Sequence, residues 1–212
     1  MTFEAGQLIN NLKIALQGEL PGQDAQYKMA PEHRARLPLH LDDANEYRLS
    51  AVMILLCQQA GGGYFVPLIE RMAYEGPHSA QISLPGGKYE LNDSDLWHTA
   101  LRECEEEIGI GQINLLGKLT PLVIPVSSFK VHPFIGVCEV TDPPMLPHLR
   151  EVRSILKLGL EELMSGNLDG SGLIQVQNFQ VKTPWLALGQ KKVWGATAMI
   201  LSEFREVLRA VS

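Results

Sequence analysis

Three glutamates within one predicted helix are the residues of this sequence best suited to chemistry. Glu103, Glu106 and Glu107 fall within roughly 100° of one another on a helical surface, because each residue turns an α-helix by about 100°. Like charges at these spacings repel by a few tenths of a kcal/mol per pair, which a bound cation relieves. Carboxylate oxygens are hard ligands that suit Mg²⁺ or Mn²⁺. The cluster indicates a divalent-metal site, although a solvated helix face gives the same pattern when it stands alone.

The residues around the cluster favour the metal site. Arg102 precedes it, and Gly109 follows it at a point where a left-handed residue can end the helix. Upstream, Pro85, Gly86 and Gly87 form a predicted turn whose backbone can approach a ligand closely, since glycine has no side chain. The sequence therefore combines carboxylates, a cation and an accessible backbone in one short stretch.

The segment from Gly87 to Ile110 resembles the Nudix box, a motif written G-x5-E-x7-R-E-U-x-E-E-x-G-U, in which U is an aliphatic residue. Asp93 stands at the first glutamate of the motif, and eight residues rather than seven separate it from Arg102. Cys104 occupies an aliphatic position. The resemblance implies an α/β protein, with a Nudix-like α/β/α sandwich and a mixed β-sheet, and the metal-dependent hydrolysis of a phosphoanhydride.

The same resemblance implies a role for each part of the motif. Glu103, Glu106 and Glu107 would bind Mg²⁺ or Mn²⁺, and the carbonyl of Gly86 would add an oxygen ligand. Arg102 would act in catalysis by orienting a glutamate of the cluster. The number of metal ions stays open.

A general base and a phosphate-binding cation complete the expected site. Nudix enzymes take their general base from the box helix or from a later loop, so both Glu103 and Glu151 are candidates for the general base. Arg71, at the end of a predicted strand, could pair with a substrate phosphate through its planar guanidinium group. Lys88 follows the glycine turn and is a second candidate for binding substrate.

The departures from the box resemble the coenzyme A pyrophosphatase branch of the superfamily. Asp93 with one extra residue, preceded by the loop 81–87, resembles that branch, and residues 193–198 resemble the start of its C-terminal helix. Gly76 and Ala80 depart from it, because its upstream element has an arginine and a glycine there. The predicted substrate is coenzyme A or acyl-CoA, cleaved to 3′,5′-ADP and (acyl-)phosphopantetheine.

Two alternatives stay open. The first keeps the chemistry and changes the substrate to ADP-ribose, a dinucleotide or a nucleoside triphosphate, because Gly76 replaces the arginine of the upstream element. The second is a non-catalytic Nudix-fold regulator that binds a ligand without turnover. That class usually lacks the metal-binding glutamates, whereas this sequence retains them.

The elements that must position these residues alternate between strands and helices. Residues 22–46 contain two prolines among polar residues and predict a loop-rich connection without regular structure. Helices are expected at residues 6–17, 94–108, 160–164 and 195–211, and strands at 48–59, 64–71, 113–124, 131–140, 173–181 and 185–188. The first two strands form a predicted hairpin. Interspersed strands and helices favour an α/β protein with a mixed sheet.

The size and charge of the chain limit its partners. Its 212 residues fit one domain over 1–212, with residues 1–45 as an N-terminal helix and loop extension. A formal net charge of −6 argues against a nucleic-acid partner, and it requires local cations or metal wherever phosphate binds. We therefore expect a small-molecule nucleoside diphosphate derivative as the partner. A homodimer is a further expectation of the resemblance.

The cysteines and the apolar runs bear on location. Cys57, Cys104 and Cys138 lie in apolar surroundings without metal-binding spacing, so we expect buried free thiols in a reducing compartment. The sequence has neither a basic start followed by an apolar run nor an apolar stretch of 18 residues. We therefore expect a cytoplasmic protein that does not interact with membranes.

Overall fold

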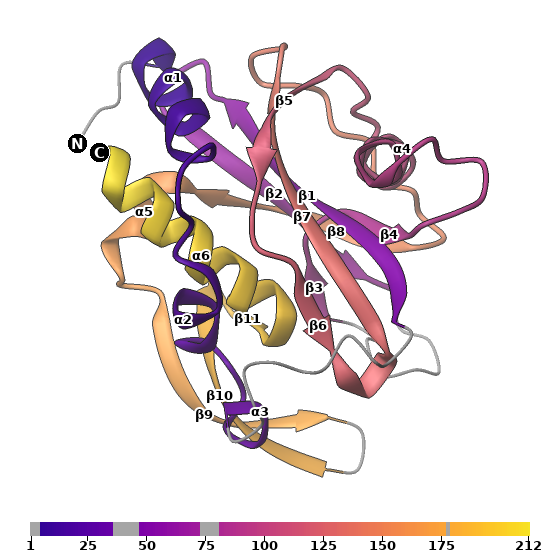
Figure 1. Ribbon diagram of the computed structural model, residues 1–212, viewed down its shortest axis with the longest axis vertical. Helices are drawn as coiled ribbons and strands as arrows, with labels where there is room; N and C mark the ends of the chain where they lie inside the picture. The colour runs from indigo at the N-terminus through magenta and orange to yellow at the C-terminus, as the bar shows by residue number, and fades with distance from the viewer. Residues whose placement is uncertain (1–4, 36–46, 73–80, 177–178) are drawn as a thin grey trace.

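A mixed sheet forms the centre of the protein (Figure 1). The computed structural model describes residues 5–35, 47–72, 81–176 and 179–212. The strands of this sheet in the described chain are β1 (Arg48–Gln58), β2 (Tyr64–Arg71), β3 (Ile82–Ser83), β4 (Gly86–Lys88), β5 (Ile113–Lys118), β6 (Leu122–Ile124), β7 (Phe129–Cys138) and β8 (Val152–Gly159). The order β3-β2-β1-β7-β5 forms the main path, and β8, β4 and β6 pair with β2, β1 and β7. Strands β1 and β7 run parallel while the other pairs are antiparallel, which confirms the predicted mixed sheet.

Helices cover both faces of this sheet (Figure 1). The covering helices are α4 (Leu96–Ile108) on one face and, on the other, α1 (Ala5–Ala15), α2 (Gly22–Tyr27) and α6 (Gly195–Val211). Side chains of a strand alternate between faces, so β1 sends Met53 and Leu55 into the core beneath α4. It sends Ile54 and Leu56 into the core beneath α6. The predicted α/β/α sandwich is confirmed.

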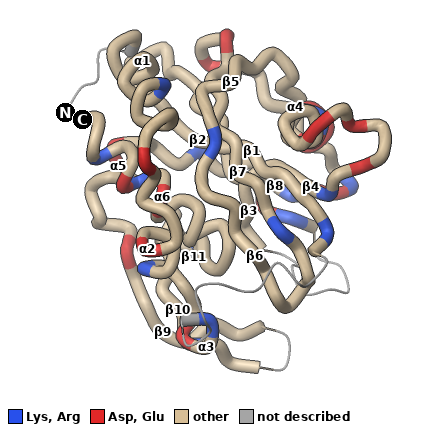
Figure 2. The backbone as a smooth tube through the Cα atoms, in the orientation of Figure 1, with Lys and Arg blue, Asp and Glu red and all other residues tan. Residues whose placement is uncertain are grey.

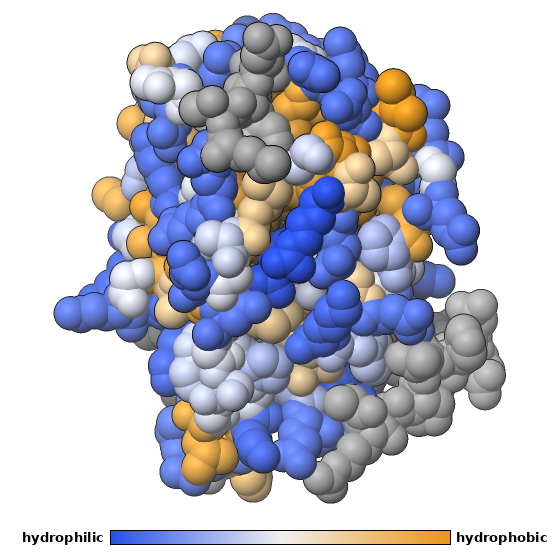
Figure 3. All heavy atoms as spheres, turned by 90° about the vertical axis from the view of Figure 1, so that its left-hand side faces the viewer, coloured by the Kyte–Doolittle hydropathy of each residue, from blue (hydrophilic) through white to orange (hydrophobic). Residues whose placement is uncertain are grey.

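The face that carries α1, α2 and α6 shows how the N-terminal segment attaches. Leu8, Leu12 and Leu16 are at most 9% exposed and belong to the same core cluster as α6. The face of the molecule that Figure 3 shows is mostly hydrophilic, with hydrophobic side chains in several patches. The predicted amphipathic helix at 6–17 is thus present, and it packs on the body of the protein. Among the described helices, none is long and apolar enough to cross a membrane.

A smaller antiparallel sheet follows the main one in the chain. It consists of β9 (Asp169–Val176), β10 (Phe179–Leu188) and β11 (Lys191–Trp194), and β10 lies between the other two. Three short helical segments complete the described structure: α3 (Glu32–Ala35), which contacts β10, η1 (Pro125–Ser127) and α5 (Leu160–Ser165). This sheet and α3 lie together at the lower end of the view in Figure 1.

Several sequence predictions are confirmed. The hairpin forms through pairing of Cys57 with Phe65, and the last helix spans Gly195–Val211 as expected. Asp95 caps α4, and Gly109 ends it with a left-handed φ of 76°. All three cysteines are free and buried, and burial raises the pKa of the Cys57 thiol well above its usual value. They are inert packing residues in this state.

The expectation of a structureless connection over residues 22–46 is wrong for its first part. Helices α2 and α3 lie within it, while residues 36–46 lie outside the described chain. Ala25 and Gln26 are buried, and the Gln26 side chain donates a 2.8 Å hydrogen bond to Glu203 of α6. Tertiary contact with α6 thus stabilises a helical turn that local sequence alone does not favour.

Two strand predictions need correction. The single strand expected at 113–124 is divided into β5 and β6, because Pro121 between them has no N–H group for a sheet hydrogen bond. The strand expected at 173–181 contains the end of β9 and the start of β10, which pair with each other. Strand β8 was not predicted, because Arg153 and Lys157 interrupt its apolar pattern.

Candidate active site

Helix α4 directs the glutamate cluster towards the sheet. Ala100, Cys104 and Ile108 are fully buried in the core cluster that β1 shares, so this apolar stripe fixes the rotation of the helix. Figure 2 shows acidic residues gathered on α4 and on the loop that leads into it. The side chains of Glu103 and Glu107 are 13% and 2% exposed, because they lie on the edge of the stripe.

Arg102 and Asp93 form the centre of an ionic network beside the cluster. The Asp93 carboxylate accepts hydrogen bonds from Arg102 Nε at 2.9 Å and from the Thr99 hydroxyl at 2.9 Å. Arg102 Nη1 in turn donates to Glu103 at 3.0 Å and to Glu106 at 3.2 Å. The hydrogen bond from Arg102 lowers the pKa of Asp93 to about 2. The aspartate that departs from the box therefore anchors the arginine that contacts two of the glutamates.

We expect Asp93→Asn to lower the free energy of unfolding at pH 7 by about 1.5–3 kcal/mol, because it weakens charge-assisted hydrogen bonds of a buried carboxylate. The folded pKa of about 2 lies below the ordinary 3.8, so the stabilisation is present above pH 3.8 and is lost as the pH falls towards 2. Urea unfolding at several pH values measures both effects. A deficit that persisted unchanged at pH 2 would contradict this assignment.

The glycine turn lies directly against the glutamates. The Gly86 N–H donates a 2.8 Å hydrogen bond to Glu107 Oε2. A Cβ atom on Gly87 would lie 2.2 Å from Glu103 Oε1, so only glycine leaves room for that carboxylate in its present position. Gly86 has φ of +151°, a conformation that L side chains rarely adopt. Both glycines thus serve the close approach that the sequence predicted.

Arg71 already places a cation at this turn. Its Nη2 atom lies 2.8 Å from the Gly86 carbonyl oxygen and 3.2 Å from Glu107 Oε1, and its Nε donates to Ser83 Oγ at 3.2 Å. Burial raises the pKa of Glu107 to about 7 and also raises the pKa of Glu103, despite these arginine contacts. The turn and the helix edge therefore form an oxygen-rich site that attracts positive charge.

The chemistry of these donors fits Mg²⁺ or Mn²⁺. Glu107 Oε1 is buried and accepts no hydrogen bond in the described structure, and the neighbouring ligand candidates are also oxygens. Within the described parts of the chain, however, no three His, Cys, Asp or Glu side chains lie close enough to form a ready metal centre. Glu106 is 60% exposed and contacts Arg102. The predicted ligands share one region without converging on one point in this conformation.

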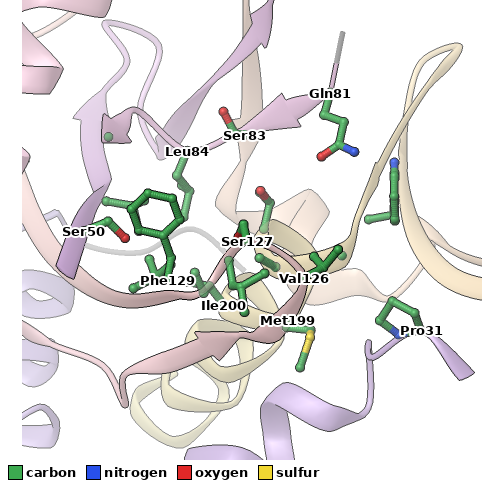
Figure 4. A pocket seen from close by; sticks show the side chains of 18 of the residues that line it. Pro31, Ser50, Gln81, Ser83, Leu84, Val126, Ser127, Phe129, Met199 and Ile200 are labelled. Atoms are coloured by element: carbon green, nitrogen blue, oxygen red, sulfur yellow. The ribbon is translucent and has the colours of Figure 1, made fainter. Parts of the chain in front are cut away.

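A cavity of about 440 Å³ opens beside the glycine turn, within the roughly 300–1,000 Å³ range of small-molecule sites (Figure 4). Arg71, Gly86 and the exposed Lys88 line it, together with largely apolar residues of β7, η1 and α6. The labelled side chains of Phe129 and Ile200 are among the apolar ones. The two predicted substrate-binding cations therefore border one ligand-sized space.

A model of the NUDIX domain family matches residues 47–169 of this sequence. The chain belongs to the Nudix family. The match begins next to β1 and includes the glycine turn, α4 and β8. Helices α1 to α3, strands β10 and β11 and helix α6 lie outside it.

Several known proteins are similar to this Nudix chain. Human mitochondrial coenzyme A diphosphatase NUDT8 is 30% identical over 154 residues, which cover 71% of this chain and 65% of the human protein. The mouse protein of the same name is 29% identical and is covered to 73%. The uncharacterized Nudix hydrolase NudL of Yersinia pestis is 30% identical over 166 residues, covering 76% of this chain and 80% of its own length.

Solved structures share the fold. The Nudix hydrolase RenU from M. smegmatis has a TM-score of 0.51 at 16% identity, covering 87% of this chain and 95% of its own. A MutT/nudix family protein from Enterococcus faecalis also has a TM-score of 0.51, at 17% identity, covering 99% of this chain and 76% of its own. At these identities, the likeness supports the Nudix fold alone.

Parts of the Nudix site were beyond sequence reasoning. Ser83, which accepts a hydrogen bond from Arg71, has no signal that separates it from other loop serines. Much of the cavity wall comes from outside the matched segment, including Pro31 and Arg34 of the N-terminal region and the start of α6. Glu151, the second candidate base, is 59% exposed, and its charge contributes to the raised pKa of Glu107. Its main-chain N–H donates to the His148 carbonyl oxygen, and the His148 N–H donates to the Glu107 carbonyl oxygen, so Glu151 lies near the site.

Proposed function

We propose that this Nudix protein hydrolyses the diphosphate of coenzyme A or acyl-CoA to 3′,5′-ADP and (acyl-)phosphopantetheine, with Mg²⁺ or Mn²⁺ as cofactor. The observation that carries the proposal is the meeting of Glu103 and Glu107 with the Gly86–Gly87 turn and Arg71 at the edge of a cavity. The names of the human and mouse relatives support coenzyme A as the substrate.

The glutamates and the glycine turn would hold the cofactor. Glu103, Glu106 and Glu107 are the proposed carboxylate ligands, and the carbonyl of Gly86 is the proposed backbone ligand. When bound, a divalent ion lowers the pKa of a water ligand and offsets charge on the departing phosphate. Arg71 would then exchange its contacts with Gly86 and Glu107 for a phosphate of the substrate.

The remaining steps belong to protein side chains. Arg71 and Lys88 bind the diphosphate oxygens at the cavity wall, while Arg102, held by Asp93, fixes the position of Glu103. Glu103 takes the proton of the attacking water as its oxygen bonds to phosphorus. The bridging P–O bond breaks at the same phosphorus, and its electrons leave with the second phosphate. Glu151 is the alternative base for this proton.

A substrate panel tests the proposal. Purified protein is incubated with coenzyme A, acetyl-CoA, ADP-ribose, a diadenosine polyphosphate and a nucleoside triphosphate, each with Mg²⁺ or Mn²⁺, and products are separated by chromatography. The proposal expects 3′,5′-ADP from the first two substrates as the fastest reaction. Faster cleavage of another diphosphate would overturn it in favour of the second candidate, which Gly76 motivates. That residue lies outside the described chain.

Glu106→Gln separates an enzyme from a regulator that only binds ligand. We expect the substitution to lower kcat by at least about tenfold. Even the loss of a group that only orients a metal ligand typically lowers metal affinity or activity by about 10- to 100-fold. The side chain is 60% exposed, so the thermal unfolding temperature should stay close to that of the wild type. Steady-state kinetics and thermal unfolding measure the two effects. Undiminished turnover in a folded variant would show that Glu106 is not a ligand.

A further inference from the structure

Arg34 is a buried cation that the proposed reaction does not yet use. The residue is 8% exposed, its guanidinium group donates to the Val123 carbonyl oxygen, and it lies over the Tyr27 ring at 5.7 Å. Its Nε atom is buried and has no hydrogen-bond partner in the described structure. Within the described ranges, no carboxylate forms an ion pair with it. An anionic ligand at this position would offset the desolvation of the buried guanidinium group.

The cavity that Arg34 lines is the one that reaches the glycine turn. Arg71, Gly86 and Lys88 border the same space, and apolar residues such as Phe129 form much of the remaining wall. A ligand that fills the cavity therefore meets cations at the turn, apolar surface along the wall and a further cation on α3. A lining with two groups of cations and an apolar wall suits a ligand that carries a diphosphate, an aromatic base and a further anionic group.

We propose that Arg34 binds the 3′-phosphate of the coenzyme A nucleotide, with the adenosine against the apolar wall. The inference rests on the proposed function. A guanidinium group presents a planar set of donors that matches phosphate oxygens, and it stays charged even when burial lowers its pKa, as it does for Arg34. The residue lies outside the matched segment 47–169, so it would add substrate preference to the shared Nudix site.

Arg48 provides a matched control for a purely structural role. It donates to the Ser127 carbonyl oxygen at 2.7 Å and lies over the Phe129 ring at 4.2 Å. Both arginines thus connect a backbone carbonyl of the β6–η1 segment with an aromatic ring. Arg34 lines the cavity and is buried, whereas Arg48 does not line it and is exposed.

The test compares coenzyme A with dephospho-CoA, which lacks only the 3′-phosphate. We expect the wild type to prefer coenzyme A in kcat/KM, and Arg34→Gln to reduce this preference by roughly ten- to hundredfold, the effect of one charged hydrogen-bonding group. Arg34→Lys should restore part of it, because the charge is kept. Arg48→Gln should leave the preference unchanged, although it removes a similar structural contact.

Each outcome decides the proposal. Equal use of coenzyme A and dephospho-CoA by the wild type, or equal losses in Arg34→Gln and Arg48→Gln, would overturn the role of Arg34 while the proposed hydrolysis stood. Cleavage of another diphosphate with neither of these substrates used would instead overturn the proposed function. If Arg34→Gln does not fold, calorimetry of the wild type with 3′,5′-ADP and 5′-AMP replaces it. Tighter binding of 3′,5′-ADP supports the proposal, and equal affinity overturns it.

Discussion

Glu107→Gln is expected to lower kcat by about a hundredfold or more, because a divalent ion held by Glu107, as proposed, would supply several kcal/mol of transition-state stabilisation and each 1.36 kcal/mol is a factor of ten. Glu107 is the most buried carboxylate of the cluster, and it holds the Gly86 N–H as well as Arg71. Glutamine keeps the volume and one acceptor oxygen, so the turn should persist. Kinetics with coenzyme A over a range of Mg²⁺ concentrations measures the loss and the expected rise in the Mg²⁺ requirement.

Glu105→Gln is the control on the same helix. Glu105 is exposed and belongs to neither the cavity wall nor the arginine network of the described structure. Its substitution by glutamine removes the same charge from the helix as Glu107→Gln does. We expect unchanged kcat and an unchanged Mg²⁺ requirement. If both variants lost activity equally, general electrostatics would explain the result. Full activity of Glu107→Gln would remove Glu107 from the proposed ligands.

The position of the glutamate cluster could be predicted because it depends on local rules. The 3.6-residue period fixed which side of the helix between Asp95 and Gly109 would be buried, and the carboxylates followed on its edge. The glycine turn was likewise readable from Gly86 and Gly87, since close backbone approach requires the absence of a side chain. Helix period and glycine geometry both depend on a few neighbouring residues, so contacts with distant segments did not change either prediction.

The rest of the site depends on contacts between distant segments. Asp93 was recognised only as a departure from the box, because its hydrogen bonds to Arg102 and Thr99 arise from how the loop folds against α4. Arg34 lies in a segment expected to be structureless, and it becomes notable only when the cavity and its burial are known. No spacing rule connects either residue with the glutamate cluster of α4. Prediction from one sequence therefore found the glutamate cluster and the glycine turn and missed the cavity beside them.

Substitution of the two adjacent glycines should separate catalysis from folding. Gly87→Ala is expected to lower kcat/KM by about tenfold or more, because the new Cβ would lie 2.2 Å from Glu103 Oε1 and must displace that carboxylate. The contact is with the end of a flexible side chain, and the Gly87 backbone is not in the left-handed region, so the fold should be kept. Kinetics with coenzyme A and urea unfolding of the same preparation measure both quantities.

Gly86→Ala should instead destabilise the protein by at least about 3 kcal/mol, since strain at φ of +151° adds to overpacking against the sheet. Its Cβ would lie 2.4 Å from the Ala51 carbonyl oxygen and 2.6 Å from Val52 Cα, and backbone atoms of a central strand cannot move aside as a carboxylate can. If Gly87→Ala were as unstable as Gly86→Ala, the turn would serve folding alone. If Gly87→Ala kept full activity, the carboxylate of Glu103 would not need its present position. Loss of activity in a stable Gly87→Ala protein would tie the glycine turn to the chemistry of the glutamates, because Gly87 contacts the carboxylate of Glu103 directly.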